Sequence, residues 1–158
     1  MDIRYNTPLT AEEQLAFGLA APQPLAMADK VRFAELDPQN HANNKAYVEW
    51  FETLRVEYNY RFLHPKWRGQ RPRGVVHSFS VRFLKETFRG ESYVCTARVS
   101  KFRTSSYTME QELWAGGTLR ATKSALIVLL EHDGTGRFPL PEEVLEEFRT
   151  RDGAVFDG

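Results

Sequence analysis

The stretch that decides the fold reads VRFAELDPQNHANNKAYVEWFETLRVEY, residues 31 to 58, and the spacing of its apolar residues changes once. Residues 29–36 alternate apolar with charged positions, which predicts a strand that ends at Asp37–Pro38. Between residues 44 and 62 the large apolar residues recur every three or four positions, the pattern of a helix of about five turns. A polar, Asn-rich turn therefore joins a predicted strand to a long predicted helix.

The chain after this helix alternates with a period of two. Residues 63–74 contain two Pro and two Gly, which end the helix in a loop. Four segments then read as strands, at residues 75–86, 91–102, 106–117 and 118–131, with Gly116–Gly117 as a tight hairpin signal. A last helix is expected in PLPEEVLEEFR, residues 139–149. One helix followed by consecutive strands predicts an α+β fold, with an antiparallel sheet wrapped around one long central helix.

The segment before residue 29 is predicted to be an arm outside this domain. Thr10 and Glu13 have the spacing of a capping box, which predicts a short helix, and a Pro-rich linker follows. We therefore assign residues 1–28 to an N-terminal arm and residues 29–158 to a single domain. A chain of 158 residues with 42% hydrophobic residues is sufficient for one such core.

Composition excludes several classes of partner. Lys plus Arg and Asp plus Glu each number 21, so no net charge favours nucleic acid or an anionic membrane. No apolar run approaches the roughly 20 residues that span a bilayer, and acidic residues and prolines in the N-terminal segment argue against a signal peptide. Cys95 is the single cysteine, which is typical of the cytoplasm, and its alternating context indicates a core residue. The four histidines are scattered, so we predict no metal site and no cofactor.

The turn between residues 37 and 44 has two interpretations. Asp37 lies where a strand meets a helix, a rigid junction suited to a catalytic carboxylate, and the free amides at the helix start could polarise a carbonyl oxygen. Alternatively, Asp37 starts an ordinary turn, Asn43 or Asn44 caps the helix, and Asn40 adopts a positive φ. Spacing alone favours the simpler interpretation, with His41 as a polar loop residue.

A family resemblance favours the catalytic one. Residues 31–58 resemble the segment that marks the 4-hydroxybenzoyl-CoA thioesterase branch of the hotdog-fold thioesterases, in which an Asp precedes a Gly-His-Val-Asn-Asn type of turn and a helix with Tyr. SKFRTSSYTMEQELW (100–114) and TLRATKSALIVLLEHDGTGRFPLPEEV (118–144) resemble later strands and the ending of that family. The resemblance covers about residues 29 to 147. This chain departs from it at Asn40, where many relatives have Gly.

The resemblance implies a hotdog fold and a cytoplasmic acyl-CoA thioesterase. Asp37 would be the catalytic carboxylate, as nucleophile or general base, and the backbone amide of Asn44 would bind the thioester oxygen. The substrate-binding residues implied or expected are His41, Asn43, Tyr47, Lys101, Arg103, Ser105 and Ser106. The family assembles as homodimers or homotetramers with active sites between subunits, and it needs no cofactor.

Three alternatives remain open. Fewer basic residues follow the third strand than in the benzoyl-CoA members, so an acyl carrier protein could replace coenzyme A as the acyl donor. A dehydratase or hydratase would use a histidine, for which His41 is the candidate. A non-catalytic acyl-CoA-binding protein could retain the fold without the activity.

Overall fold

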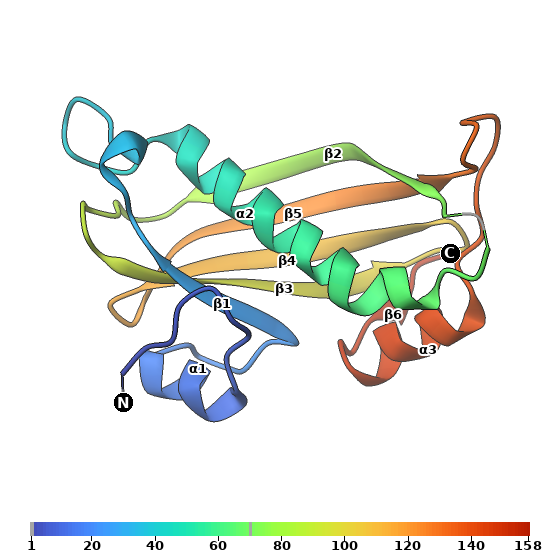
Figure 1. Ribbon diagram of the computed structural model, residues 1–158, viewed down its shortest axis with the longest axis horizontal. Helices are drawn as coiled ribbons and strands as arrows, with labels where there is room; N and C mark the ends of the chain where they lie inside the picture. The colour runs from blue at the N-terminus through green and yellow to red at the C-terminus, as the bar shows by residue number, and fades with distance from the viewer. Residues whose placement is uncertain (1, 70) are drawn as a thin grey trace.

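The computed structural model describes residues 2–69 and 71–158 and places a six-stranded sheet against one long helix (Figure 1). The helices are α1 (Ala11–Phe17), α2 (Asn44–Tyr58) and α3 (Glu142–Thr150). The strands are β1 (Leu25–Lys30), β2 (Arg73–Phe83), β3 (Ser92–Phe102), β4 (Ser106–Ala115), β5 (Thr118–Leu130) and β6 (Val155–Phe156). Met1 of the predicted arm and Gln70 of the predicted loop lie outside the described residues.

The strand order is β1-β3-β4-β5-β2, with neighbours antiparallel, and β6 adds a short parallel pair beside β3. The predicted α+β hotdog arrangement is therefore confirmed. The four strands expected after the helix are β2 to β5. In the sheet β3, β4 and β5 are neighbours in chain order, whereas β2 pairs with β5. Gly116 and Gly117 connect β4 to β5 with φ of 55° and 71°, the positive values that a two-residue hairpin turn needs.

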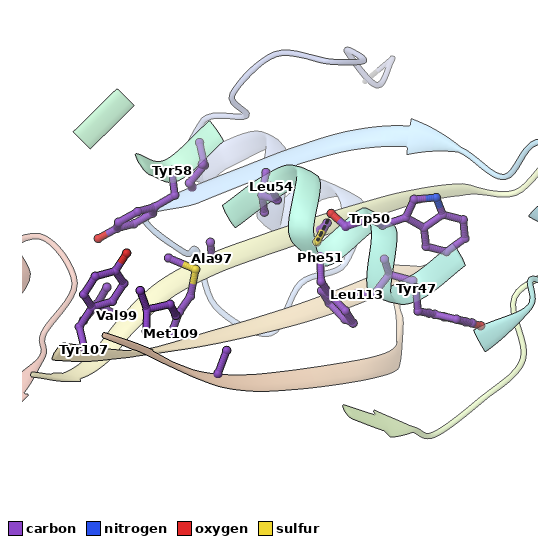
Figure 2. Packing of buried hydrophobic residues seen from close by; sticks show 14 of the residues in the cluster. Tyr47, Trp50, Phe51, Leu54, Tyr58, Ala97, Val99, Tyr107, Met109 and Leu113 are labelled. Atoms are coloured by element: carbon purple, nitrogen blue, oxygen red, sulfur yellow. Dashed lines mark hydrogen bonds between the residues drawn. The ribbon is translucent and has the colours of Figure 1, made fainter. Parts of the chain in front are cut away.

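The apolar stripe of α2 faces the sheet, as its spacing predicts. The helix contributes Tyr47, Trp50, Phe51, Leu54 and Tyr58 to the core, and none of these residues is more than 6% exposed. They pack on alternate residues of β3, β4 and β5 (Figure 2). The helical path continues through a π-helical turn at Asn59–Leu63, close to the predicted end at residue 62. Replacing one of the buried aromatic residues by Ala would cost about 3–5 kcal/mol.

The prediction of the first strand is wrong in position. The strand is β1, at Leu25–Lys30, and Phe33–Glu35 form a short 3-10 helix instead. β1 is buried on both faces, because Leu25 belongs to the α2 core while Ala26 and Ala28 face the arm, so it shows no alternation. Phe33 alternates with charged neighbours, which suggested a strand with one buried face, but its side chain is 73% exposed. The predicted arm boundary at residue 28 therefore falls inside a strand of the sheet.

The N-terminal arm packs on the sheet face opposite α2. Its helix α1 has the predicted capping box, since Thr10 Oγ1 accepts from the Glu13 amide and the Glu13 carboxylate accepts from the Thr10 amide. A second apolar cluster consists of Leu9, Leu19, Ala26, Ala28 and Val94. Val94 alternates with Tyr93 and Cys95, which face α2, so this cluster lies on the other face of the sheet.

A buried polar cluster fastens the C-terminal segment to α2. Tyr58 donates its hydroxyl hydrogen to Asp152 at 2.5 Å, and the same carboxylate accepts from the Val99 amide at 2.8 Å and from Arg151 Nε at 2.7 Å. The buried carboxylate of Asp152 therefore accepts hydrogen bonds from α2, from β3 and from the neighbouring Arg151. Within the described part of the chain, no helix is long and apolar enough to cross a membrane.

Strand β2 lies at the open edge of the sheet (Figure 1). A β-bulge at His77 shifts its register against β5, so His77 does not share the face of Phe79, Val81 and Phe83 as the simple alternation predicts. Four apolar residues on or next to this edge are 38–51% exposed: Val76, Phe79, Phe83 and Leu84. This edge also borders the candidate site.

Candidate active site

The turn that precedes α2 is built around the side chain of Asp37. Its Oδ1 accepts hydrogen bonds from the amides of Gln39 and His41, both at 2.9 Å. Asn40 completes the turn in the left-handed region, with φ of 67°, as expected for a residue type that tolerates a positive φ. Among the described residues no donor contacts Asp37 Oδ2, so one carboxylate oxygen fixes the turn and the other is available to a ligand.

The start of α2 is capped by Asn43 and leaves the amide of Asn44 open. Asn43 Oδ1 accepts from the Ala46 amide at 2.8 Å, the bond of an N-cap residue. Asn44 is the first residue of the helix, and in the described part of the chain its amide has no hydrogen-bond acceptor. Asn43 therefore caps the helix, as the simpler interpretation predicts, and the free amide of Asn44 keeps the partial positive charge that the catalytic interpretation needs.

A cavity of about 260 Å³ brings the predicted residues together. Its walls include Asp37, His41, Asn44 and Tyr47 from the turn and helix, and Phe83 from β2. Tyr47 is 3% exposed and donates its hydroxyl hydrogen to Thr87 at 2.8 Å, so its hydroxyl is already occupied. Burial raises the pKa of Tyr47, although the bond to Thr87 opposes this. The site can therefore hold a carbonyl between a carboxylate and a helix terminus.

The segment after β2 supplies residues that the sequence did not indicate. Glu86 Oε2 lies 3.2 Å from His41 Nε2, and the His41 ring packs edge-on against Phe88 at 5.3 Å between centroids. The carbonyl of Thr87 accepts from the Ala42 amide at 2.8 Å. Residues 84–86 were predicted as the tail of a strand, and no local pattern places residues 84–88 beside the turn at residues 37–42.

Arg120 on β5 holds this segment in place. Its two terminal nitrogens donate to the carboxylate of Glu91, each at 3.0 Å, and one of them also donates to the Glu86 carbonyl at 2.5 Å. Burial alone would raise the pKa of Glu91, but the hydrogen bonds from Arg120 and the Phe88 amide lower it overall. The ion pair between Arg120 and Glu91 therefore stabilises the loop after β2, whose residues contact His41 and Tyr47.

The basic residues predicted to bind substrate lie in a different cavity. Lys101, Arg103 and Ser106 line a space of about 520 Å³ together with Arg137 and Ser124. Ser124 alternates along β5 with the core residues of the α2 side, so this basic cavity lies on the opposite face of the sheet. The same cavity is lined by His77–Ser80 of β2, whereas the Asp37 cavity is lined by Phe83–Glu86. Ser105, also predicted, lines neither of these two cavities.

Other reactive groups do not form a site in the described residues. No cluster of three or more His, Cys, Asp or Glu side chains could hold a metal ion in residues 2–69 and 71–158. Cys95 is 3% exposed, and burial raises the pKa of its thiol, as expected for the core residue that its alternating context indicates.

Comparison with known proteins points to one family. The family model described as the thioesterase-like superfamily matches residues 31–148. A thioesterase superfamily structure from Jannaschia sp. CCS1 is 40% identical, with a TM-score of 0.88, and covers 96% of this chain and 97% of its own. A thioesterase from Thermus thermophilus, complexed with coenzyme A and Zn, is 30% identical, with a TM-score of 0.71 over 83% of this chain and 96% of its own.

More distant structures share the fold. The Staphylococcus aureus protein SAV2348, solved in complex with CoA, is 16% identical, with a TM-score of 0.72 over 80% of this chain and 84% of its own. Among curated proteins no significant match was found. The family model spans most of the chain, and the Jannaschia protein matches it almost end to end. The chain therefore belongs to the thioesterase-like superfamily.

Proposed function

We propose that the protein is an acyl-CoA thioesterase that hydrolyses its substrate to a free acid and coenzyme A. The observation that carries this proposal is that Asp37 and Asn44, the first residue of α2, line the same cavity. The thioester carbonyl oxygen would accept a hydrogen bond from the Asn44 amide, where the helix dipole stabilises developing negative charge. Membership of the thioesterase-like superfamily supports the same chemistry.

Asp37 would supply the attack on the thioester carbonyl through Oδ2. As a general base it removes a proton from water while the water oxygen bonds to the carbonyl carbon. As a nucleophile it forms a mixed anhydride that water then hydrolyses. In both routes the carbon–sulfur bond breaks and coenzyme A leaves as the thiolate, which takes up a proton. Label in the carboxylate of Asp37 after single-turnover hydrolysis in heavy-oxygen water would establish the nucleophilic route, because only a mixed anhydride that water attacks at the Asp37 carbon places solvent oxygen there.

The remaining predicted residues would position the substrate. His41, held by Glu86, and the ring of Tyr47 form part of the cavity wall around the thioester. Asn43 would act indirectly, by fixing the helix start that carries the Asn44 amide. We assign no substrate contact to Ser105, because its described contact is a structural one, in which its carbonyl accepts from the Leu129 amide at 2.9 Å.

The basic cavity on the other sheet face would bind the phosphates of coenzyme A. Lys101, Arg103 and Arg137 line it, and the one carboxylate among its described lining residues, Asp157, lies 3.9 Å from Arg103. Cations gathered with hydroxyl donors suit a phosphorylated nucleotide. The Thermus relative is complexed with coenzyme A, which supports coenzyme A as the carrier of the acyl group. We expect Lys101→Met to raise KM for an acyl-CoA but not for the same acyl group on N-acetylcysteamine, which lacks the nucleotide.

We further propose that the active assembly is a homodimer paired through β2, alone or within a homotetramer. An eleven-residue edge strand with exposed Val76, Phe79, Phe83 and Leu84 is a surface suited to pairing with a second copy. The Asp37 cavity opens beside that edge, so a second subunit would complete its wall. Light scattering of the purified protein measures the mass, and Val76→Lys is expected to shift it toward the monomer.

The central test is the pair Asp37→Asn and Asp37→Ala in a thiol-release screen over straight-chain, branched and aromatic acyl-CoAs. Wild type should release thiol from at least one of them. Asp37→Asn should lower kcat by a factor of about 100 or more, the size expected for a positioned acid or base. Full turnover of both variants on every substrate that wild type cleaves would refute the role of Asp37.

The same screen separates the alternatives. Release from acyl carrier protein without release from acyl-CoA would identify the carrier protein as donor. Binding of acyl-CoA in calorimetry without thiol release would identify a non-catalytic binding protein. Hydration of an enoyl-CoA that depends on His41 would identify a hydratase. The cytoplasmic location rests on cysteine usage and stays a prediction.

A further inference from the structure

Lys123 is a buried cation in the middle of β5. It lies between Ala121 and Ala125 on the face that packs against α2, and it is 4% exposed. Its backbone neighbours are Val81 on β2 and Gln111 on β4. The ammonium lies 4.8 Å from the centre of the Phe79 ring, and within the described part of the chain it has neither a hydrogen bond nor an ion pair.

A second cation and an unused acceptor lie in the same region. Arg55 of α2 has a side chain 12% exposed; one terminal nitrogen lies 3.5 Å from Glu52, and its Nε is buried without a partner among the described residues. Gln111 donates to the Phe51 carbonyl at 2.8 Å, but its Oε1 is buried and likewise without a partner in that part of the chain. The region therefore holds unused donors on two cations.

The charges of this region do not balance. Burial lowers the pKa of Lys123, and the neighbouring charge of Arg55 lowers it further, while Glu52 opposes both effects. The Glu52 side chain is 62% exposed and already adjoins Arg55, so it compensates little of the charge on Lys123. Buried lysines in proteins are almost always paired, because an unpaired buried cation is costly. An anion bound beside Lys123 would remove this imbalance.

The two cations lie farther along β5 and α2 than the residues of the Asp37 cavity, and neither of them is among the residues that line it. Phe83, in the cavity wall, pairs with Ala121, and Lys123 follows two residues later, about 7 Å along the strand. On α2 the cavity residue Tyr47 is followed at intervals of four by Phe51 and Arg55, which places all three on one side of the helix. The Arg55 side chain extends toward the helix N-terminus, as helical side chains do, and one of its terminal nitrogens lies 3.5 Å from Glu52.

We propose that Lys123 and Arg55 form the far end of the acyl pocket and bind a carboxylate, so that the preferred substrate is the coenzyme A thioester of a dicarboxylic acid. This proposal rests on the proposed thioesterase function. A thioester at Asp37 and a carboxylate at Lys123 would be joined by a chain of several methylene groups. Pairing of β2 with a second subunit would cover Phe79, which is 50% exposed, and would strengthen the attraction by excluding water.

The test compares two substrates of similar shape. Adipyl-CoA carries a terminal carboxylate, and 6-methylheptanoyl-CoA carries an isopropyl group in its place. Wild type should have a kcat/KM at least about tenfold higher for adipyl-CoA, and Lys123→Met should lower that value by about 30-fold or more while sparing the isopropyl substrate. Lys30→Met is the matched control, because Lys30 is exposed on β1, and it should change neither rate.

A binding measurement keeps the inference separate from the proposed function. Free adipate should raise the melting temperature of wild type and of Lys30→Met but not of Lys123→Met, whether or not any thioester is cleaved. If Lys123→Met does not fold, Lys123→Gln replaces it. The comparison of adipyl-CoA with 6-methylheptanoyl-CoA in wild type needs no variant and tests the preference for a carboxylate by itself. Equal or faster hydrolysis of the isopropyl substrate by wild type, or an equal loss on both substrates in Lys123→Met, would overturn the inference. An absence of thiol release with an intact adipate effect would overturn only the hydrolytic function.

Discussion

Replacing Arg120 by Met is expected to loosen the loop that supports the candidate active site. The Arg120 side chain is 11% exposed. It donates two hydrogen bonds of 3.0 Å to the Glu91 carboxylate and one to the Glu86 carbonyl. Met retains much of the apolar stem but removes every donor. The loop carries Glu86 and Thr87, which contact His41 and Tyr47, so a local loss of order should reach the Asp37 cavity.

The size of the effect follows from the exposure of the pair. Removing one partner of a fully buried ion pair costs about 3–5 kcal/mol, whereas an exposed pair contributes about 0–1 kcal/mol. Glu91 has a side chain 27% exposed, so Arg120→Met should lower the free energy of unfolding by about 2 kcal/mol. Because misplacement of positioning groups by about 1 Å can cost about 100-fold in rate, we expect kcat/KM to fall by about tenfold or more.

Urea unfolding of wild type, Arg120→Met, Glu91→Gln and the double variant measures the coupling between the two residues. A coupling of about 1–2 kcal/mol is expected at neutral pH. Since the pKa of Glu91 is lowered in the folded protein, this contribution is complete above the usual pKa of a Glu and is lost as the pH falls through the lowered value. Arg61→Met, which removes an exposed ion pair with Glu57, is the control. Additive losses, or equal stability of the Arg120 and Arg61 variants, would refute the supporting role.

Three further outcomes test the local structure. Asn40→Ala should lower the free energy of urea unfolding by about 1 kcal/mol, because Ala resists the left-handed backbone, whereas Asn40→Gly should be tolerated. Tyr58→Phe should cost about 1–3 kcal/mol in thermal unfolding, since Asp152 loses a buried donor. The pKa of Glu13 is lowered to about 2, mainly by its hydrogen bond from Arg4, so the stability difference between wild type and Glu13→Gln should shrink as the pH falls from about 4.5 toward about 2.

Much of the fold could be predicted from the period of the sequence. The stripe from Tyr47 to Tyr58 predicts the buried face of α2, and Gly116–Gly117 predicts the hairpin between β4 and β5. The first strand was misplaced, because β1 is buried on both faces and small residues such as Ala26 carry no periodic signal. The exposed Phe33 alternates with charged neighbours without forming a strand, so alternation alone does not distinguish a strand from a short 3-10 turn.

The candidate site was predictable only where it is local in sequence. Asp37, Asn44 and Tyr47 lie within eleven residues of one another, and the strand-to-helix change indicates their junction. Glu86 reaches His41 through long-range pairing of the turn with the loop after β2, which no local pattern encodes. The sequence gives no sign that Lys123 is unusual, because it occupies one inward position of an alternating strand. Only its burial and the lack of an ion-pair or hydrogen-bond partner among the described residues distinguish it.

The turn interpretation and the catalytic interpretation of Asp37 concern different oxygen atoms. Oδ1 accepts from the amides of Gln39 and His41, which orients the carboxylate and places Oδ2 in a fixed direction beside the open start of α2. An Asn side chain at this position can retain the Oδ1 acceptor and both amide bonds, but it has no second oxygen to take a proton or attack a carbonyl. Asp37→Asn should therefore melt within a few degrees of wild type while losing turnover. A large loss of stability in that variant would show that the charge of Asp37 serves the turn itself.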